Sequence, residues 1–356
     1  MSDEFYMDLA LNEAWKYQIL TYPNPAVGCV ICDKFGKILS IKAHKKAGYL
    51  HAEPMAILFA LFNLNDEILN KFLNEYNVCF TQSFKTLTEL NEADLDAKFC
   101  YEFILSNHGN LLNDASAYVT LEPCSHHGKT PACAILIKQL GFKRVIISVC
   151  DENKIASGGA KILKEAGIDV KIGVLKEHTK KLMLPFKTWL NGNFIFYKLA
   201  MSANGVITGG IISNELSRTH MHKLRGVIDL LVIGGNTVRV DRPVLDARLA
   251  NAKAPDVAIY STKRDFDTDI ALFSVKNRNV EILDNLEVIN KPLVMIEGGE
   301  QMLKKIALGE ILNVKWVLIY QSSEFKNADN IKLDVRLKPL YEGRLGDDRY
   351  GWYEVC

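Results

Sequence analysis

Short apolar runs alternate with segments of helical spacing along most of the chain, and this alternation limits the fold more than any other feature. Tyr6–Leu20 has apolar residues at helical spacing, the turn Pro23-Asn24-Pro25 interrupts it, and Val27–Ile31 is typical of a buried strand. Further strands are predicted at 38–43, 117–121, 144–149 and 169–174, and helices at 54–62, 132–140, 161–166 and 176–185. Such alternation predicts an α/β sandwich around a mixed sheet.

A second series of the same kind follows in the C-terminal half. Strands are predicted at 194–200, 230–234, 256–260, 292–296 and 314–320, with helices between them. At 356 residues the chain is also too long for one ordinary hydrophobic core. We therefore expect two α/β domains, 1–190 and 191–356, with the boundary near 180–192.

Residues from about 63 to 113 differ from the rest of the first half. They are rich in Asn, lean acidic and show a mixed helical pattern with several aromatic residues. We interpret them as a helical insertion. Two roles stay open for it: a contact between subunits of a homo-oligomer, or an elaboration of the surface.

Charge and hydropathy exclude two classes of partner. The 43 Lys+Arg residues balance 42 Asp+Glu residues, so no global basic field exists to bind nucleic acid. No stretch approaches the ~20 apolar residues of a membrane span, and the first residues do not resemble a signal peptide. Eight cysteines are scattered along the chain, which favours thiols or metal ligands over a disulfide framework. These features predict a cytoplasmic protein with a small-molecule substrate.

The strongest constellation of reactive residues is His51-x-Glu53 with Pro123-Cys124 and Cys133 downstream. An imidazole and two thiolates bind zinc and leave one tetrahedral position for water, which is typical of a catalytic site. Glu53 would take a proton from that water and pass it to a ring nitrogen and a departing amine. The alternative is a set of ordinary buried thiols and a structural histidine. It is disfavoured because His-x-Glu precedes a predicted helix and Pro-Cys ends a predicted strand.

The segment around these cysteines resembles a known family. Glu122–Cys133 places eight residues between the cysteines, and this stretch, with Tyr22–Gly28 and His44–Gly48, resembles the deaminase half of the bifunctional deaminase/reductases of riboflavin biosynthesis. The resemblance implies a cytidine-deaminase-like α/β/α sandwich that deaminates a diaminopyrimidinone ribosylamine phosphate. The residues that it implies for substrate binding are Asn24, His44, His126, Lys129 and Asp151. Lys129 is the expected phosphate ligand.

The second half resembles the reductase of the same family, which has a dihydrofolate-reductase-like α/β fold and uses NADPH. The motifs are Lys198–Gly205, Gly235–Pro243 and Glu297-Gly298-Gly299. The resemblance implies hydride transfer to the ribosyl group, which becomes a ribityl chain. The residues that it places at the cofactor are Ala200, Thr237, Asp241, Gly298 and Gly299. Those that it places at the ribosyl substrate are Arg225, Leu245, Arg248 and Glu297, with both arginines as phosphate clamps.

Two departures from the family pattern keep another reading open. Asn204 stands where the family usually has Asp, and Ile211 where it has Trp. An active deaminase with a catalytically silent C-terminal binding or dimerisation domain is the alternative. A non-catalytic, zinc-stabilised nucleotide-binding protein would require a dispensable Glu53. An RNA-editing deaminase would require a basic stripe, which the near-zero net charge disfavours.

Overall fold

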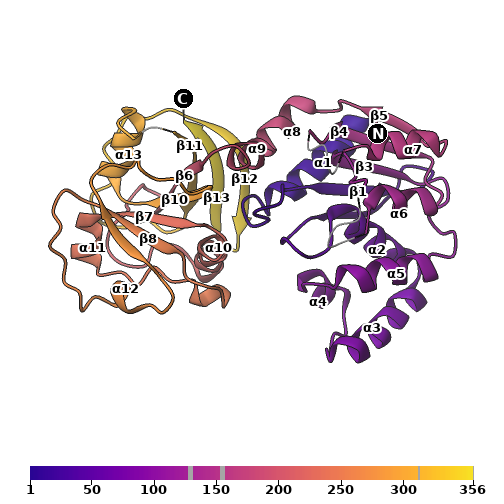
Figure 1. Ribbon diagram of the computed structural model, residues 1–356, viewed down its shortest axis with the longest axis horizontal. Coiled ribbons are helices and arrows are strands. Elements are labelled where there is room, and N and C mark those ends of the chain that lie inside the picture. Colours follow the sequence, from indigo (N-terminus) through magenta and orange to yellow (C-terminus); the bar gives the residue numbers. More distant parts are fainter. Residues whose placement is uncertain (127–130, 153–156, 312, 356) are drawn as a thin grey trace. The chain divides into compact units, whose positions relative to one another are not determined.

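The computed structural model describes residues 1–126, 131–152, 157–311 and 313–355. Within this part the chain divides into two compact units, Met1–Leu184 and Pro185–Cys356 (Figure 1). Each unit contains one mixed sheet with helices interleaved along the chain, so the predicted α/β class is confirmed. Among the described helices, none is long and apolar enough to cross a bilayer.

The N-terminal unit is built on a five-stranded sheet in the order β2-β1-β3-β4-β5. Its strands are β1 (Gly28–Cys32), β2 (Ile38–Ala43), β3 (Ser116–Leu121), β4 (Arg144–Val149) and β5 (Asp169–Ile172). β1 runs antiparallel to both of its neighbours, whereas β3, β4 and β5 are parallel. The carboxyl ends of β3 and β4 therefore lie at one edge, where loops carry polar residues.

Helices cover both faces of this sheet. The helices are α1 (Asp3–Trp15), α2 (Ala52–Leu64), α6 (Cys133–Gln139), α7 (Gly159–Glu165) and α8 (Lys176–Leu182). α1 contacts α8, and α2 contacts α6, which in turn contacts α7. α1 lies so close to β1 that a Cβ on Gly28 would come within 1.9 Å of the Ala10 carbonyl oxygen. Helix α1 ends at Trp15 rather than at the predicted Leu20, because turns follow it and Ile19 adopts a left-handed φ of 72°.

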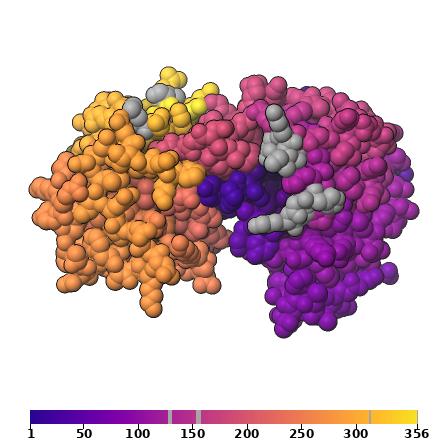
Figure 2. Space-filling model, in the orientation of Figure 1, coloured from indigo at the N-terminus to yellow at the C-terminus, as the bar shows by residue number. Residues whose placement is uncertain are grey.

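The predicted helical insertion consists of α3 (Asp66–Phe80), α4 (Leu87–Glu92) and α5 (Ala97–Asn107). It forms the purple part of the N-terminal unit beyond α2 (Figures 1 and 2). Helix α2 is buried along nearly its whole length, as expected of a helix that is apolar all round. One side of α2 packs on β1 and β2, and α3 and α5 contact it as well. Phe62 and Phe72 carry this second contact, with ring centroids 5.1 Å apart.

The C-terminal unit has an eight-stranded sheet in the order β12-β13-β11-β6-β10-β7-β8-β9. Its strands are β6 (Phe194–Met201), β7 (Leu230–Gly234), β8 (Asp256–Tyr260), β9 (Val280–Leu283), β10 (Leu293–Glu297), β11 (Val314–Gln321), β12 (Leu337–Leu345) and β13 (Asp348–Val355). The six strands from β11 to β9 pair in parallel. The helices are α9 (Leu184–Trp189), α10 (Glu215–Arg225), α11 (Gly235–Asp241), α12 (Ala271–Ser274) and α13 (Glu300–Ala307), with a 3-10 turn at Arg248–Ala250.

The hairpin β12–β13 lies beyond the last strand that the sequence analysis predicted. No residue of β12 is buried, and the strand lacks the apolar run that marks a buried strand in the sequence. Pairing with β11 and packing of Trp352 against Trp316 and Phe196 attach the hairpin to the sheet. The contact partners lie tens of residues away, which is why local patterning did not reveal it.

Candidate functional site

Three predicted ligands meet in the N-terminal unit. His51 is the N-cap residue of α2, Cys124 follows β3, and Cys133 opens α6. His51 Nδ1 lies 3.7 Å from Cys124 Sγ and 3.4 Å from Cys133 Sγ. All three atoms lie within 4.8 Å of one another, and no other His/Cys/Asp/Glu trio among the described residues is so placed. One imidazole and two sulfurs are a donor set that fits zinc with a fourth position left open.

The two sulfurs share one negative charge, which lies on Cys124. Hydrogen bonds from Cys133 and His51 lower the pKa of Cys124 to about 4, and the Cys133 backbone N–H also donates to the Cys124 sulfur at 3.3 Å. Contact with that thiolate, together with burial, raises the pKa of Cys133. The pair thus holds one proton, which a bound divalent cation would displace.

Glu53 lies beside the trio in the first turn of α2. It is 4 % exposed, and burial raises the pKa of its carboxyl to about 7. A carboxyl that titrates near neutrality can both accept and donate a proton at physiological pH. The three predicted ligands and the predicted proton carrier are therefore brought together by the starts of α2 and α6 and the end of β3.

Asn24 and His44 lie next to this cluster. His44 stacks edge-on against His51 with ring centroids 5.4 Å apart. Its Nδ1 lies 2.8 Å from the carbonyl oxygen of Leu50, which can only accept, so Nδ1 carries the hydrogen. Nε2 then accepts from Asn24 Nδ2 at 3.1 Å. Burial lowers the pKa of His44 to about 4, which agrees with this neutral tautomer. The structure thus brings Asn24 and His44 into the same site.

Glu122 is a residue of this site that the sequence analysis did not single out. Its buried carboxylate accepts hydrogen bonds from the backbone N–H groups of Asp151, Gly158 and Ala160 at 2.9 to 3.1 Å. It therefore fixes the chain on both sides of 153–156 beside the metal trio. Its place two residues before Cys124 was the available signal. Of the remaining predicted substrate residues, His126 is exposed and Lys129 lies outside the described residues.

The helical insertion contacts the segment that carries His44. Lys42 Nζ donates to Asn91 Oδ1 at 2.6 Å, and Lys45 Nζ donates to the Asn91 carbonyl oxygen. Lys46 forms an ion pair with Asp94 at 2.5 Å. These contacts tie α4 and the residues after it to the connection between β2 and α2. The insertion is thus joined to the frame of the candidate site.

In the C-terminal unit the predicted cofactor residues follow neighbouring parallel strands. Ala200 lies near the end of β6, Gly298 and Gly299 follow β10, and Thr237 and Asp241 lie in α11 directly after β7. β10 pairs with both β6 and β7, so these ends share one edge of the sheet. Ligands of open parallel sheets bind at this edge. The fold thus brings the five residues to adjacent strand ends.

The turn after β10 requires glycine at one position. A Cβ on Gly298 would lie 2.8 Å from the Met302 Cβ. Gly299 is the N-cap of α13, and Tyr197 Oη donates to the Gly298 carbonyl oxygen at 2.7 Å. The turn is therefore compact and held from the neighbouring strand, with the backbone N–H groups at the start of α13 as donors.

Two of the predicted substrate residues bond to each other. Arg225 donates from Nε and Nη2 to the two carboxylate oxygens of Glu297 at 2.8 and 2.9 Å, and from Nη1 to the Asp246 carbonyl oxygen at 3.2 Å. Lys198 Nζ lies 3.6 Å from Glu297. Burial by itself would raise the pKa of Glu297, but Arg225 and Lys198 lower it to about 2. Arg225 is thus engaged in a buried ion pair rather than presented as an isolated cation.

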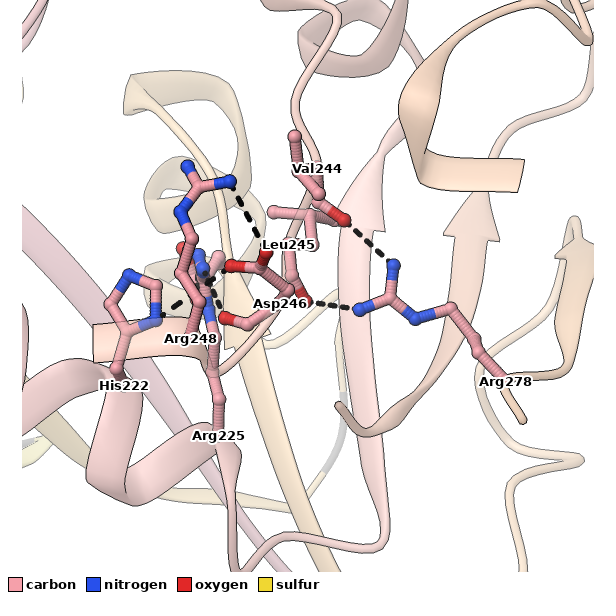
Figure 3. Close-up of polar contacts among 8 residues, drawn as sticks. His222, Arg225, Val244, Leu245, Asp246, Arg248 and Arg278 are labelled. Carbon is pink, nitrogen blue, oxygen red and sulfur yellow. Dashed lines mark hydrogen bonds and ion pairs between the residues drawn. The ribbon is translucent and has the colours of Figure 1, made fainter. Parts of the chain in front are cut away.

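Leu245 and Arg248 lie on the segment beside this pair (Figure 3). Leu245 is 5 % exposed and adopts a φ of 57°. Arg248 is exposed, and its Nη1 lies 3.2 Å from the carboxylate of Asp246, which also faces His222 at 3.8 Å. Arg248 is therefore the accessible cation of the predicted pair of phosphate clamps.

Asn204 has a structural role that accounts for an amide at this position. Its Nδ2 donates to the Lys326 carbonyl oxygen at 2.8 Å, while its Oδ1 accepts from the Lys326 N–H and the Ser202 hydroxyl. An aspartate would lack the donor that the Lys326 carbonyl uses. Ile211 is 68 % exposed. The departure at Asn204 is thus explained by a turn contact, and nothing in the structure explains Ile211.

Comparison with known proteins matches a different family model to each half of the chain. The family model of the cytidine and deoxycytidylate deaminase zinc-binding region matches residues 1–149, and the RibD C-terminal domain matches residues 193–320. The riboflavin biosynthesis protein RibD of Actinobacillus pleuropneumoniae is 29% identical over 346 residues, with 85% of this chain and 79% of that protein covered. The RibD of Bacillus amyloliquefaciens is 33% identical over 270 residues, with 73% of this chain and 60% of that protein covered.

Solved structures of similar proteins share the fold over nearly the whole chain. A diaminohydroxyphosphoribosylaminopyrimidine deaminase/5-amino-6-(5-phosphoribosylamino)uracil reductase from Thermotoga maritima has a TM-score of 0.59 at 23% identity, with 99% of both chains covered. RibD of Acinetobacter baumannii has a TM-score of 0.57 at 22% identity, also with 99% of both chains covered. With both family models matched in the same order, the chain belongs to the RibD family of bifunctional riboflavin biosynthesis proteins, which join a deaminase to a reductase.

Proposed function

We propose that the N-terminal domain, 1–190, hydrolytically deaminates a diaminopyrimidinone ribosylamine phosphate. The domain 191–356 then reduces the ribosyl group of the product to ribityl with NADPH. The observation that carries the first step is the convergence of His51, Cys124 and Cys133 beside the buried Glu53. The family supplies the substrate class and the order of the two steps.

His51, Cys124 and Cys133 would hold zinc, which when bound supplies the Lewis acidity that activates a water for attack on the pyrimidine. Glu53 accepts the proton of the attacking water and transfers it to the ring and to the departing amine, so that ammonia leaves. A pKa of about 7 suits both transfers. Asn24 and His44 orient the base, and Asp151 lies on the chain that Glu122 holds. Lys129 and His126 are proposed to bind the phosphate end.

In the reductase half, Ala200, Thr237, Asp241 and the Gly298-Gly299 turn are proposed to hold NADPH at the strand ends. The cofactor would supply a hydride to the anomeric carbon of the ribosyl group; the bond from that carbon to the ring oxygen breaks, and the oxygen takes a proton from solvent to become a hydroxyl of the ribityl chain. Leu245 and Glu297 face the ribosyl substrate, with Arg225 holding the Glu297 carboxylate in place. Arg248 is the proposed phosphate ligand because it is the exposed member of the cluster. Binding and orientation, rather than acid-base chemistry, would account for the rate.

The zinc-loaded protein, incubated with the substrate and NADPH, should release ammonia and consume NADPH in the same cuvette. Glu53→Gln should lower the deamination kcat by about 10²- to 10⁴-fold, the contribution typical of a general acid-base group. Glu67→Gln, a matched change in the first turn of α3, should leave it unchanged. Ammonia without NADPH oxidation would support the silent C-terminal domain instead, and full activity of Glu53→Gln would refute the proposed proton transfer.

A further inference from the structure

Arg278 lies between α12 and β9 and was not assigned a role by the sequence analysis. Its guanidinium points toward the segment with Leu245 (Figure 3). Nη1 donates to the Val244 carbonyl oxygen at 2.7 Å, and Nη2 donates to the Leu245 carbonyl oxygen. Nε donates to the Pro255 carbonyl oxygen at 2.9 Å. Nη1 also donates to the Leu272 carbonyl oxygen at 3.4 Å, so this one side chain bonds to four main-chain carbonyls, three of them in the connection between α11 and β8.

The partners of Arg278 are backbone carbonyls. The side chain is half-buried, and burial, with Arg225 nearby, lowers its pKa to about 10. Asp246 and Asp256 favour the charged form but make no hydrogen bond to it among the contacts of the described residues. Removing a guanidinium from water is costly unless its N–H groups donate to fixed acceptors. The hydrogen bonds therefore fix the position of the Arg278 side chain and of the carbonyl groups that it binds.

The segment that Arg278 holds has an unusual backbone. Leu245 adopts a φ of 57°, a left-handed conformation that a residue with a branched side chain avoids unless its surroundings impose it. Arg278 holds the carbonyls of Val244 and Leu245, and Arg225 holds the next one, that of Asp246. Two guanidinium groups therefore fix three consecutive carbonyls, and Arg225 also binds Glu297.

We propose that Arg278 is a positioning residue of the reductase site: it imposes the backbone conformation of Val244–Asp246 that places Leu245 and Arg248 against the ribosyl substrate. This inference rests on the proposed function, because it takes Leu245 and Arg248 as substrate residues. Arg278 itself touches neither substrate nor NADPH. Its loss should therefore act on the binding of the ribosyl substrate and leave the cofactor site on β6, β10 and α11 intact.

The test compares Arg278→Met, which keeps an unbranched apolar stem and removes the donors, with Arg278→Lys and with Arg336→Met, a change at an exposed arginine of the same unit. In Arg278→Met the KM for the ribosyl substrate should rise about tenfold or more, in line with the sensitivity of catalysis to small misplacements. The KM for NADPH and the deaminase activity should not change. Arg278→Lys should recover only part of the loss, because an ammonium lacks the planar fork.

Amide hydrogen exchange over residues 244–250 supplies a readout that does not depend on activity. Exchange there should accelerate in Arg278→Met and remain as in the wild type in Arg336→Met. Unchanged exchange together with an unchanged KM, in a variant that folds, would overturn the proposal. An equal rise of both KM values with a lower melting temperature would also overturn it and identify a general stabilising role. A wild type that never oxidises NADPH would refute the reductase function, whereas the exchange experiment would still decide whether Arg278 holds the segment.

Discussion

The two candidate sites use charged residues in opposite ways. In the deaminase domain, Glu53 lies beside the sulfurs of Cys124 and Cys133, which belong to a candidate site for a metal cation. In the reductase domain, Arg225 and Glu297 neutralise each other in a buried pair. Charged residues of the family motifs therefore serve as candidate ligands in one half of the chain and as structural framework in the other. Motif matching by itself does not separate these two roles.

Removal of the metal should separate the two halves most sharply. Dialysis against a chelator should abolish ammonia release, since water is a poor nucleophile at neutral pH without a Lewis acid. Oxidation of NADPH with the deaminated pyrimidine should persist, because no corresponding trio exists among the described residues of the second unit. Restoration of ammonia release by added zinc completes the experiment. Loss of both activities on chelation would contradict the comparison.

Breaking the buried pair should destabilise the reductase unit rather than remove a substrate contact alone. Glu297→Gln leaves Arg225 buried without its carboxylate, which typically costs about 3 to 5 kcal/mol. Denaturant unfolding followed by tryptophan fluorescence would report mainly on this unit, which contains Trp189, Trp316 and Trp352. Glu287→Gln, at an exposed position, is the control. If the free energy of unfolding fell by less than about 1 kcal/mol, the pair would contribute no more than an exposed ion pair, and the prediction would be wrong.

Acid should weaken the same unit through His220. Burial, with a smaller effect of Lys223, lowers its pKa from 6.5 to about 4, so the folded chain holds neutral imidazole. As the pH falls below 6.5 the unfolded chain binds the proton first. The stability contribution is therefore full above pH 6.5 and decreases toward pH 4, by about 2 kcal/mol between pH 7 and pH 5. His220→Gln should flatten this dependence, whereas His178→Gln, at an exposed position of the other unit, should not.

The smallest expected effect concerns the insertion. Asn91→Ala removes the amide that accepts from Lys42 near the segment with His44. Loss of one such hydrogen bond costs about 1 kcal/mol, so deamination kcat/KM should fall by about two- to fivefold. Asn107→Ala removes a similar contact, to Lys71, that lies within the insertion. Equal effects of both changes would show that the insertion only covers α2.

Local patterns were sufficient for most of the fold. The strand at Val27–Ile31 and the helix after His51 were predicted because apolar periodicity is a property of neighbouring residues. The hairpin β12–β13 was not, because its outer strand β12 is stabilised by pairing with β13, which in turn pairs with β11. For the candidate sites, too, local features were predicted and contacts between distant residues were not. His51 and Cys133 stand at helix starts that periodicity locates, whereas the ion pair of Arg225 with Glu297 joins residues 72 positions apart.

Sequence patterns alone were sufficient to predict the α/β class, a metal-binding trio with a neighbouring carboxyl, and the family. These follow from short motifs whose residues are set by the periodicity of single helices and strands. Three other features became visible only in the folded chain: Glu122 holds the chain after β4, α3 and α5 contact α2, and Arg278 bonds to the carbonyls of Val244 and Leu245. Those contacts depend on how distant segments pack. A charged side chain can face water as far as its local sequence is concerned, but once it is buried it needs a polar partner, and that partner comes from another part of the chain.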